Sequence, residues 1–151
     1  MLNQVRRSAR STTALAIAAT FCLTAAAMCQ APQPGVSATR IVAMEYPPFA
    51  RMAYLRGTVD LVATISREGT VAAVRVVSGP PMLATPAKEN LSKWRFTGCA
   101  SPTGQCEAKL VFSFVLLPGS CDSASHCPSE FEVDLPNKVL LRAQTLKAIV
   151  D

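Results

Sequence analysis

The alternation of apolar and polar residues is the feature that most constrains the fold of this chain. It runs through TVDLVATI (58–65) and EAKLVFSFVLL (107–117), where every second side chain is apolar. A period of two is typical of a strand that buries one face. Between these segments, Gly69 lies in the turn SREGT and is followed by VAAVRVVSG (71–79), which predicts a hairpin. We therefore expect three strands in one small antiparallel sheet.

Two short helices are expected beside these strands. The segment FARMAYL, which begins at Phe49, contains good helix formers, and Gly57 lies just past its end, where helices commonly stop. A second helix is predicted from an N-cap at Thr85 and a proline at the first helical position, Pro86, to about Trp94. The order helix–strand–strand–helix–strand predicts an α+β fold with two helices packed on an antiparallel sheet of three strands.

Residues 118–151 follow the third predicted strand, and we expect them to form a disulfide loop, an extra strand and a tail. Within it, Phe131, Val133 and Leu135 alternate with acidic residues, which predicts an added C-terminal strand. A bend or a hairpin at Pro136-Asn137 is left open.

The N-terminus has the layout of a secretory signal peptide. A basic segment, MLNQVRRSAR, precedes the apolar stretch TTALAIAATFCLTAAAM and a run of small residues. We expect a signal peptide over 1–31, a short linker over 32–45 and a domain over 46–117. An uncleaved membrane anchor is the alternative, because the apolar stretch is close to the ~20 residues that span a bilayer.

The charge of the chain gives little support for nucleic-acid binding. The net charge of +5 falls to +2 without the three arginines of the leader. No run of basic residues alternates with aromatic residues, so nucleic acid is not an expected partner.

The cysteines predict disulfides rather than reactive thiols. An exported chain cleaved at the end of the leader keeps an even set, which favours disulfides in an oxidising compartment. The spacing favours two local bridges, Cys99–Cys106 and Cys121–Cys127, although four cysteines allow three connectivities. The set is Cys99, Cys106, Cys121 and Cys127.

Enzymatic and metal-binding functions find little support in the remaining residues. His126 beside Cys127 suggests a metal site, but an exported protein oxidises its thiols, and paired short spacings typical of zinc are missing. No pair of carboxylates lies in an apolar setting. We expect no catalytic residue, metal or cofactor. Four arginines are expected on a solvated surface: Arg51, Arg56, Arg75 and Arg95.

Four segments, taken together and in order, resemble the C-terminal domain of the TonB energy transducers. They are YPPFARMAYLRGTV, the hairpin TISREGTVAAVRVVSGPP, the helix ending in KWRF, and the closing strand KLVFSF. The resemblance covers residues from about Tyr46 to Leu117. It implies a periplasmic domain that binds the N-terminal peptide of an outer-membrane transporter, or another envelope protein, by strand addition.

By position, the resemblance places two kinds of partner-binding residue. Tyr46 and Pro47 would lie near the receptor-facing surface, although Tyr46 is equally compatible with packing onto the sheet. The free edge would be the strand 110–116, where Val111, Ser113 and Val115 alternate with the core-facing side chains.

The chain also departs from a full energy transducer. Its apolar leader looks cleavable, and a linker ending at Glu45 reaches only about 50 Å at ~3.3 Å per residue. The added strand could also cover the edge that receives the peptide. The alternative is therefore a stand-alone periplasmic structural or assembly module with a self-blocked edge, as a monomer or homodimer. An uncleaved leader would instead anchor it in the inner membrane.

Overall fold

The computed structural model of the chain describes residues 35–123 and 126–147. The predicted signal peptide and the last residues of the tail lie outside this range. The described part contains two helices, α1 (Pro48–Met52) and α2 (Pro81–Leu91). Its strands are β1 (Ala38–Arg40), β2 (Gly57–Ser66), β3 (Val71–Ser78), β4 (Arg95–Phe96), β5 (Gln105–Cys121), β6 (Glu130–Asp134) and β7 (Lys138–Leu146).

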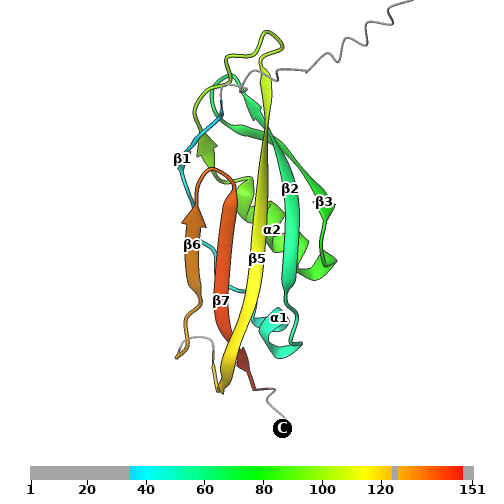
Figure 1. Cartoon of the computed structure of the whole chain (residues 1–151), viewed down its shortest axis with the longest axis vertical. Coiled ribbons are helices and arrows are strands. Elements are labelled where there is room, and N and C mark those ends of the chain that lie inside the picture. Colours follow the sequence, from blue (N-terminus) through cyan, green and yellow to red (C-terminus); the bar gives the residue numbers. More distant parts are fainter. Residues whose placement is uncertain (1–34, 124–125, 148–151) are drawn as a thin grey trace, which may run out of the picture. The chain divides into compact units, whose positions relative to one another are not determined.

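Five of the strands form one mixed sheet in the order β3-β2-β5-β7-β6 (Figure 1). Neighbouring strands are antiparallel except β5 and β7, which run in the same direction. The short strands β1 and β4 pair with each other in a separate two-stranded sheet. The long central strand β5 therefore has a neighbour on each side.

The expected helices on a three-stranded antiparallel sheet are wrong as a description of this fold. The described residues are mainly strand, in a five-stranded mixed sheet and a second sheet of two strands. After β5, residues 130–146 form a hairpin of β6 and β7 rather than one added strand, so of the two possibilities left open at Pro136-Asn137 the hairpin is the one observed. The physical reason is that β7 pairs in parallel with β5, whose register partners lie 25 to 27 residues earlier, for example Val111 with Lys138 and Cys121 with Leu146. A parallel pair is not joined by a tight turn, so it leaves no local pattern in the sequence.

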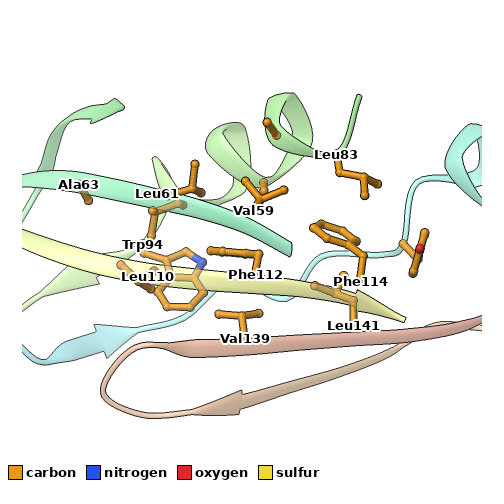
Figure 2. Packing of buried hydrophobic residues seen from close by; sticks show 14 of the residues in the cluster. Val59, Leu61, Ala63, Leu83, Trp94, Leu110, Phe112, Phe114, Val139 and Leu141 are labelled. Atoms are coloured by element: carbon orange, nitrogen blue, oxygen red, sulfur yellow. The ribbon is translucent and has the colours of Figure 1, made fainter. Parts of the chain in front are cut away.

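The core lies on one face of the five-stranded sheet. The segment before α1 and the apolar side of α2 pack against the alternating side chains of β2, β5 and β7 (Figure 2). The fully buried side chains include Val59 of β2, Phe112 of β5 and Leu141 of β7. The indole of Trp94 lies 6.2 Å from the Phe112 ring, measured between centroids. The C-terminal hairpin is thus part of the core rather than an appendage.

The helix α2 begins earlier than the sequence predicts. Pro80 occupies the N-cap and Pro81 the first turn, so Pro86 lies inside the helix. The first turn of a helix has free N–H groups, and a proline there removes none that is needed. The helix ends at Leu91, and Trp94 follows in a turn in which its N–H donates to the Leu91 carbonyl.

The helix α1 also ends earlier than expected. It stops at Met52, and the first residue after it with a positive φ is Tyr54, at 55°. Gly57 instead begins β2. The short helix is bounded by Pro47, whose carbonyl accepts a hydrogen bond from the Arg51 N–H.

We predict that Gly79→Ala lowers the free energy of unfolding by about 2 kcal/mol or more. Gly79 has φ +119°, and an added Cβ would lie 2.7 Å from the Thr58 carbonyl oxygen and 2.8 Å from the Val59 Cα. Gly57→Ala is the matched control, because φ is +143° there but the nearest atom is 3.5 Å away. Urea unfolding of both variants should show the larger loss for Gly79→Ala; equal losses would mean that the close approach does not matter.

Candidate functional site

The predicted binding edge on β5 is paired on both sides in the structure. Val111 and Ser113 lie opposite Asp60 and Thr58 of β2. On the other side, β7 runs alongside the same part of β5, from Lys138 opposite Val111 to Arg142 opposite Val115. The expectation of a free edge over 110–116 is therefore wrong, because β7 occupies it.

The strand β7 occupies this edge in the manner of an added strand. It lies parallel to β5 over nine register pairs, with one irregularity between Leu117 and Ser120. The Val111 N–H donates to the Asn137 carbonyl at 2.8 Å. On the core side, Val139 and Leu141 are at most 1 % exposed. Backbone pairing and alternate apolar contacts therefore both hold β7 in place.

The three predicted edge residues share the face of the sheet opposite the core. Val115 is the most exposed of them, at 40 %, and Val111 and Ser113 are half-buried. Beside them on β7 are Lys138, Leu140 and Arg142. Contact of Val111, Ser113 and Val115 with a partner stays a prediction. With β7 in place, these side chains would present the face of the sheet to the partner and not a free backbone edge.

The outer strand of the hairpin has the properties of a protected edge. β6 has only five residues, and the carboxylates of Glu130 and Glu132 lie 3.8 and 3.0 Å from the Arg142 guanidinium of β7. Short length and charged side chains both disfavour pairing with another chain. The hairpin therefore replaces the expected open edge by one that is poorly suited to strand addition.

Tyr46 is a core residue in this structure. Its side chain is 1 % exposed and packs edge-on against Phe114, with ring centroids 5.3 Å apart. Its hydroxyl donates to the Leu55 carbonyl, and its N–H donates to the Ser129 Oγ at 2.9 Å. Pro47, next in sequence, is half-buried. Tyr46 thus packs onto the sheet, which was one of its two possible roles. A receptor contact by Tyr46 or Pro47 stays a prediction.

We predict that stability decreases with rising pH between about 10 and 12 because of Tyr46. Burial raises the pKa of its hydroxyl to about 12, against the opposing effect of Arg51 and Arg56. The folded chain therefore keeps a proton that the unfolded chain, with a pKa of ~10, releases. The expected loss is up to about 1.4 kcal/mol per pH unit, the value for one proton. Urea unfolding across this range should show this slope in the wild type and a smaller one in Tyr46→Phe; identical slopes would contradict the assignment.

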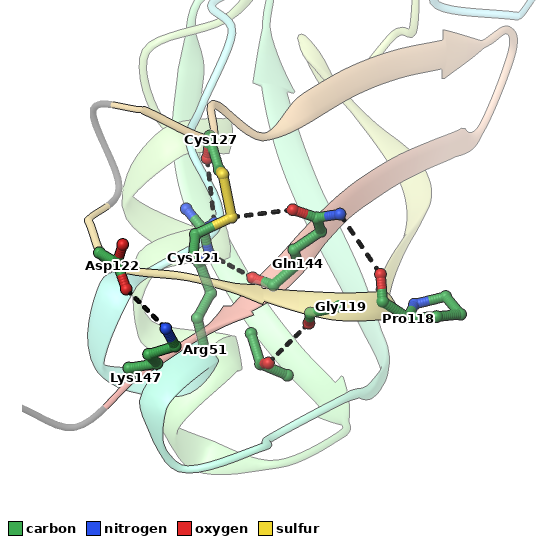
Figure 3. The surroundings of a disulfide bond; sticks show 9 residues. Arg51, Pro118, Gly119, Cys121, Asp122, Cys127, Gln144 and Lys147 are labelled. Atoms are coloured by element: carbon green, nitrogen blue, oxygen red, sulfur yellow. Dashed lines mark hydrogen bonds and ion pairs between the residues drawn. A yellow bond between two sulfur atoms is a disulfide. The ribbon is translucent and has the colours of Figure 1, made fainter.

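Arg51 is a buried residue that hydrogen-bonds to the C-terminal part of the chain. It was expected on a solvated surface, but it is 1 % exposed. Its Nε donates to the Gln144 carbonyl of β7 at 2.7 Å, and an Nη donates to the Cys127 carbonyl at 3.0 Å (Figure 3). Among the described residues, no carboxylate forms an ion pair with it. Arg51 therefore joins α1 to the C-terminal hairpin through backbone carbonyls.

The two local disulfides predicted from the cysteine spacing are confirmed. Cys99 bridges to Cys106 and Cys121 bridges to Cys127, with Cα atoms 5.7 and 6.2 Å apart. Within residues 35–123 and 126–147, no three His, Cys, Asp or Glu side chains gather as a metal site. In the same part of the chain, no helix has the length and apolar character needed to cross a membrane.

The first part of the described structure, up to residue 116, matches a known protein family. Residues 42–116 match the family described as the Gram-negative bacterial TonB protein C-terminal. These residues form a TonB C-terminal domain. Domains of this family are non-catalytic and transport-associated, act in the periplasm and interact with outer-membrane proteins. No functionally curated protein matches the chain.

The match to the TonB C-terminal family stops inside β5, at residue 116. The end of β5, the Cys121–Cys127 disulfide and both strands of the hairpin all follow it. The structure thus combines a TonB C-terminal domain with a following segment that pairs with its long strand. The Arg51 side chain, inside the matched residues, donates hydrogen bonds to this segment in two places.

Proposed function

We propose that this chain is an exported, non-enzymatic TonB-like module that recognises extended segments of envelope proteins by strand addition. It would act in the periplasm, in or beside energy-dependent transport across the outer membrane. The family match supports the setting. The N-terminal peptide of an outer-membrane transporter is the partner that the family suggests, and another envelope protein is the alternative.

The observation that carries the proposal is the pairing of β7 with β5. A segment from outside the family match lies parallel to β5 over nine register pairs and places Val139, Leu141 and Ala143 in the core. β5 is thus compatible with an extended strand that has apolar residues at alternate positions. In the intact chain this place is taken, so we propose that the chain is self-blocked and does not transduce energy by itself.

Comparison of the intact chain with a variant lacking Cys121–Asp151 tests this proposal. The probes are synthetic N-terminal segments of outer-membrane transporters, and binding is measured by calorimetry. We expect binding by the truncated chain and at least tenfold weaker binding by the intact chain. Failure of a folded truncated chain to bind any probe would refute strand addition, and equal binding by both chains would refute self-blocking.

A second variant covers the case in which the truncated chain does not fold. Ser113 and Leu140 are register partners on β5 and β7, so Ser113→Cys with Leu140→Cys can link the two strands. We expect the linked chain to lose the weak binding that the intact chain shows through transient opening. Undiminished binding by the linked chain would place the partner elsewhere than on the β7 side of β5.

A further inference from the structure

The Cys121–Cys127 disulfide lies where the chain leaves β5 and leads toward the hairpin of β6 and β7. Cys121 is the last residue of β5 and is paired with Leu146, the last residue of β7. Cys127 lies in the segment that leads into β6. The bond therefore ties the beginning of the hairpin to the end of the strand that the hairpin covers (Figure 3).

The same bond positions one of the two carbonyls held by Arg51. The guanidinium donates to the carbonyls of Cys127 and of Gln144, so one buried cation contacts the disulfide loop and β7 together. The Gln144 side chain lies against the bond as well, with its Oε1 2.8 Å from the Cys121 Sγ. A disulfide sulfur carries no hydrogen, so this is a close packing contact and not a hydrogen bond.

From this geometry we infer that the Cys121–Cys127 disulfide is a redox latch on the β5 edge. The inference rests on the proposed function, because it concerns the edge at which a partner strand would bind. With the bond intact, the loop and Arg51 hold the hairpin on β5. With the bond reduced, the loop loses its closure and the Cys127 carbonyl is no longer fixed beside Arg51. The hairpin then opens more often and exposes the edge.

The chemical step is a thiol–disulfide exchange with a dithiol oxidoreductase of the envelope. One thiolate of the dithiol attacks the Cys127 sulfur, because Cys127 is half-buried whereas Cys121 is 4 % exposed. Cys121 leaves as a thiolate and takes up a proton. The second thiol of the dithiol then attacks the mixed disulfide and releases Cys127 as a thiol. The latch gains two electrons and two protons, and the dithiol becomes a disulfide.

The expected size of the effect follows from loop closure. A bond across the six-residue separation of Cys121 and Cys127 restricts the opened loop. In the chain-entropy estimate, breaking such a bond favours the open form by roughly tenfold to fiftyfold. The neighbouring Asp122–Lys147 ion pair is well exposed and should add little to this.

The other disulfide provides a matched control. Cys106 is the register partner of Ile65 on β2, and the Cys99 N–H donates to the Ser66 carbonyl. This bond spans a similar separation of seven residues but holds the loop before β5, on the side of β2. It should therefore leave the pairing of β7 unchanged.

The test measures amide hydrogen exchange in β7 of the full chain, oxidised and after treatment with dithiothreitol. The variants are Cys121→Ser/Cys127→Ser and the control Cys99→Ser/Cys106→Ser. We expect exchange in β7 at least tenfold faster in the reduced chain and in the first variant, with β2 amides still protected. The control should keep slow exchange in β7. Unchanged β7 exchange in the first variant, or equal acceleration in both variants, would overturn the latch.

A labelled peptide with the β7 sequence, KVLLRAQTL, reports whether the edge itself becomes available. We expect it to bind the first variant and the reduced chain but not the oxidised wild type. If β7 exchange accelerates and this peptide does not bind, the open hairpin exposes no usable edge and the latch inference is wrong. If the peptide binds and no transporter segment does, the latch holds and the proposed partner class fails. The two proposals can therefore fail separately.

Discussion

Phe112→Ala should lower the free energy of unfolding by about 3–5 kcal/mol, the range for removal of a buried aromatic ring. Phe112 is fully buried and lies in register with Val59 of β2 on one side and Val139 of β7 on the other. Its ring also contacts the indole of Trp94. Removal of this ring leaves a cavity at the point where the family domain and the C-terminal hairpin share one core.

The matched control for this prediction is Phe49→Ala. Phe49 lies on α1 and is 53 % exposed, so its removal should change stability by only about 0.5 kcal/mol. Both variants can be unfolded in urea and followed by the fluorescence of Trp94, the one tryptophan of the chain. A loss below about 1 kcal/mol for Phe112→Ala would contradict the shared core.

Arg51→Ala should lower the free energy of unfolding by about 2–4 kcal/mol, because two hydrogen bonds from a charged donor are lost. The carbonyls of Cys127 and Gln144 would remain in a buried setting without this partner. Arg51→Lys should recover only part of the loss, since an ammonium group lacks the planar fork that reaches both carbonyls. The loss should also be accompanied by faster amide exchange in β7.

Arg142→Ala is the control for the removal of an arginine from the hairpin region. Arg142 pairs with Glu130 and Glu132, and all three side chains are at least 37 % exposed. Such pairs contribute at most about 1 kcal/mol. Equal effects of Arg51→Ala and Arg142→Ala would show that Arg51 has no special role in holding the hairpin.

The local features of the fold could be predicted from the sequence. Alternation located β2 and β5, and the spacing of the cysteines gave both disulfides. The four segments from YPPFARMAYLRGTV to KLVFSF, taken together, were correctly identified with the TonB C-terminal family. These features depend on neighbours in the sequence or on a pattern inside one segment, so their signals are local.

The features that decide whether the edge of β5 is open could not be predicted from local sequence patterns. In β7, KVLLRAQTL has consecutive leucines instead of strict alternation, and it pairs in parallel with β5, so no tight turn marks the pairing in the sequence. Arg51 is buried because its acceptors are carbonyls 76 and 93 residues later. An arginine among helix formers gives no sign of such partners. The covered edge of β5 and the burial of Arg51 therefore depend on contacts between distant residues, which sequence patterns do not show.

Amide hydrogen exchange at Val111, Ser113 and Val115 of the intact, oxidised chain tests the central claim most directly. The Val111 N–H donates to the Asn137 carbonyl, and residues two apart on a strand direct their backbone groups to the same side. If β7 covers β5, all three amides should be protected about as well as those of the core strand β2. Exchange at these amides at the rate of an exposed edge, with β2 still protected, would contradict the self-blocked edge.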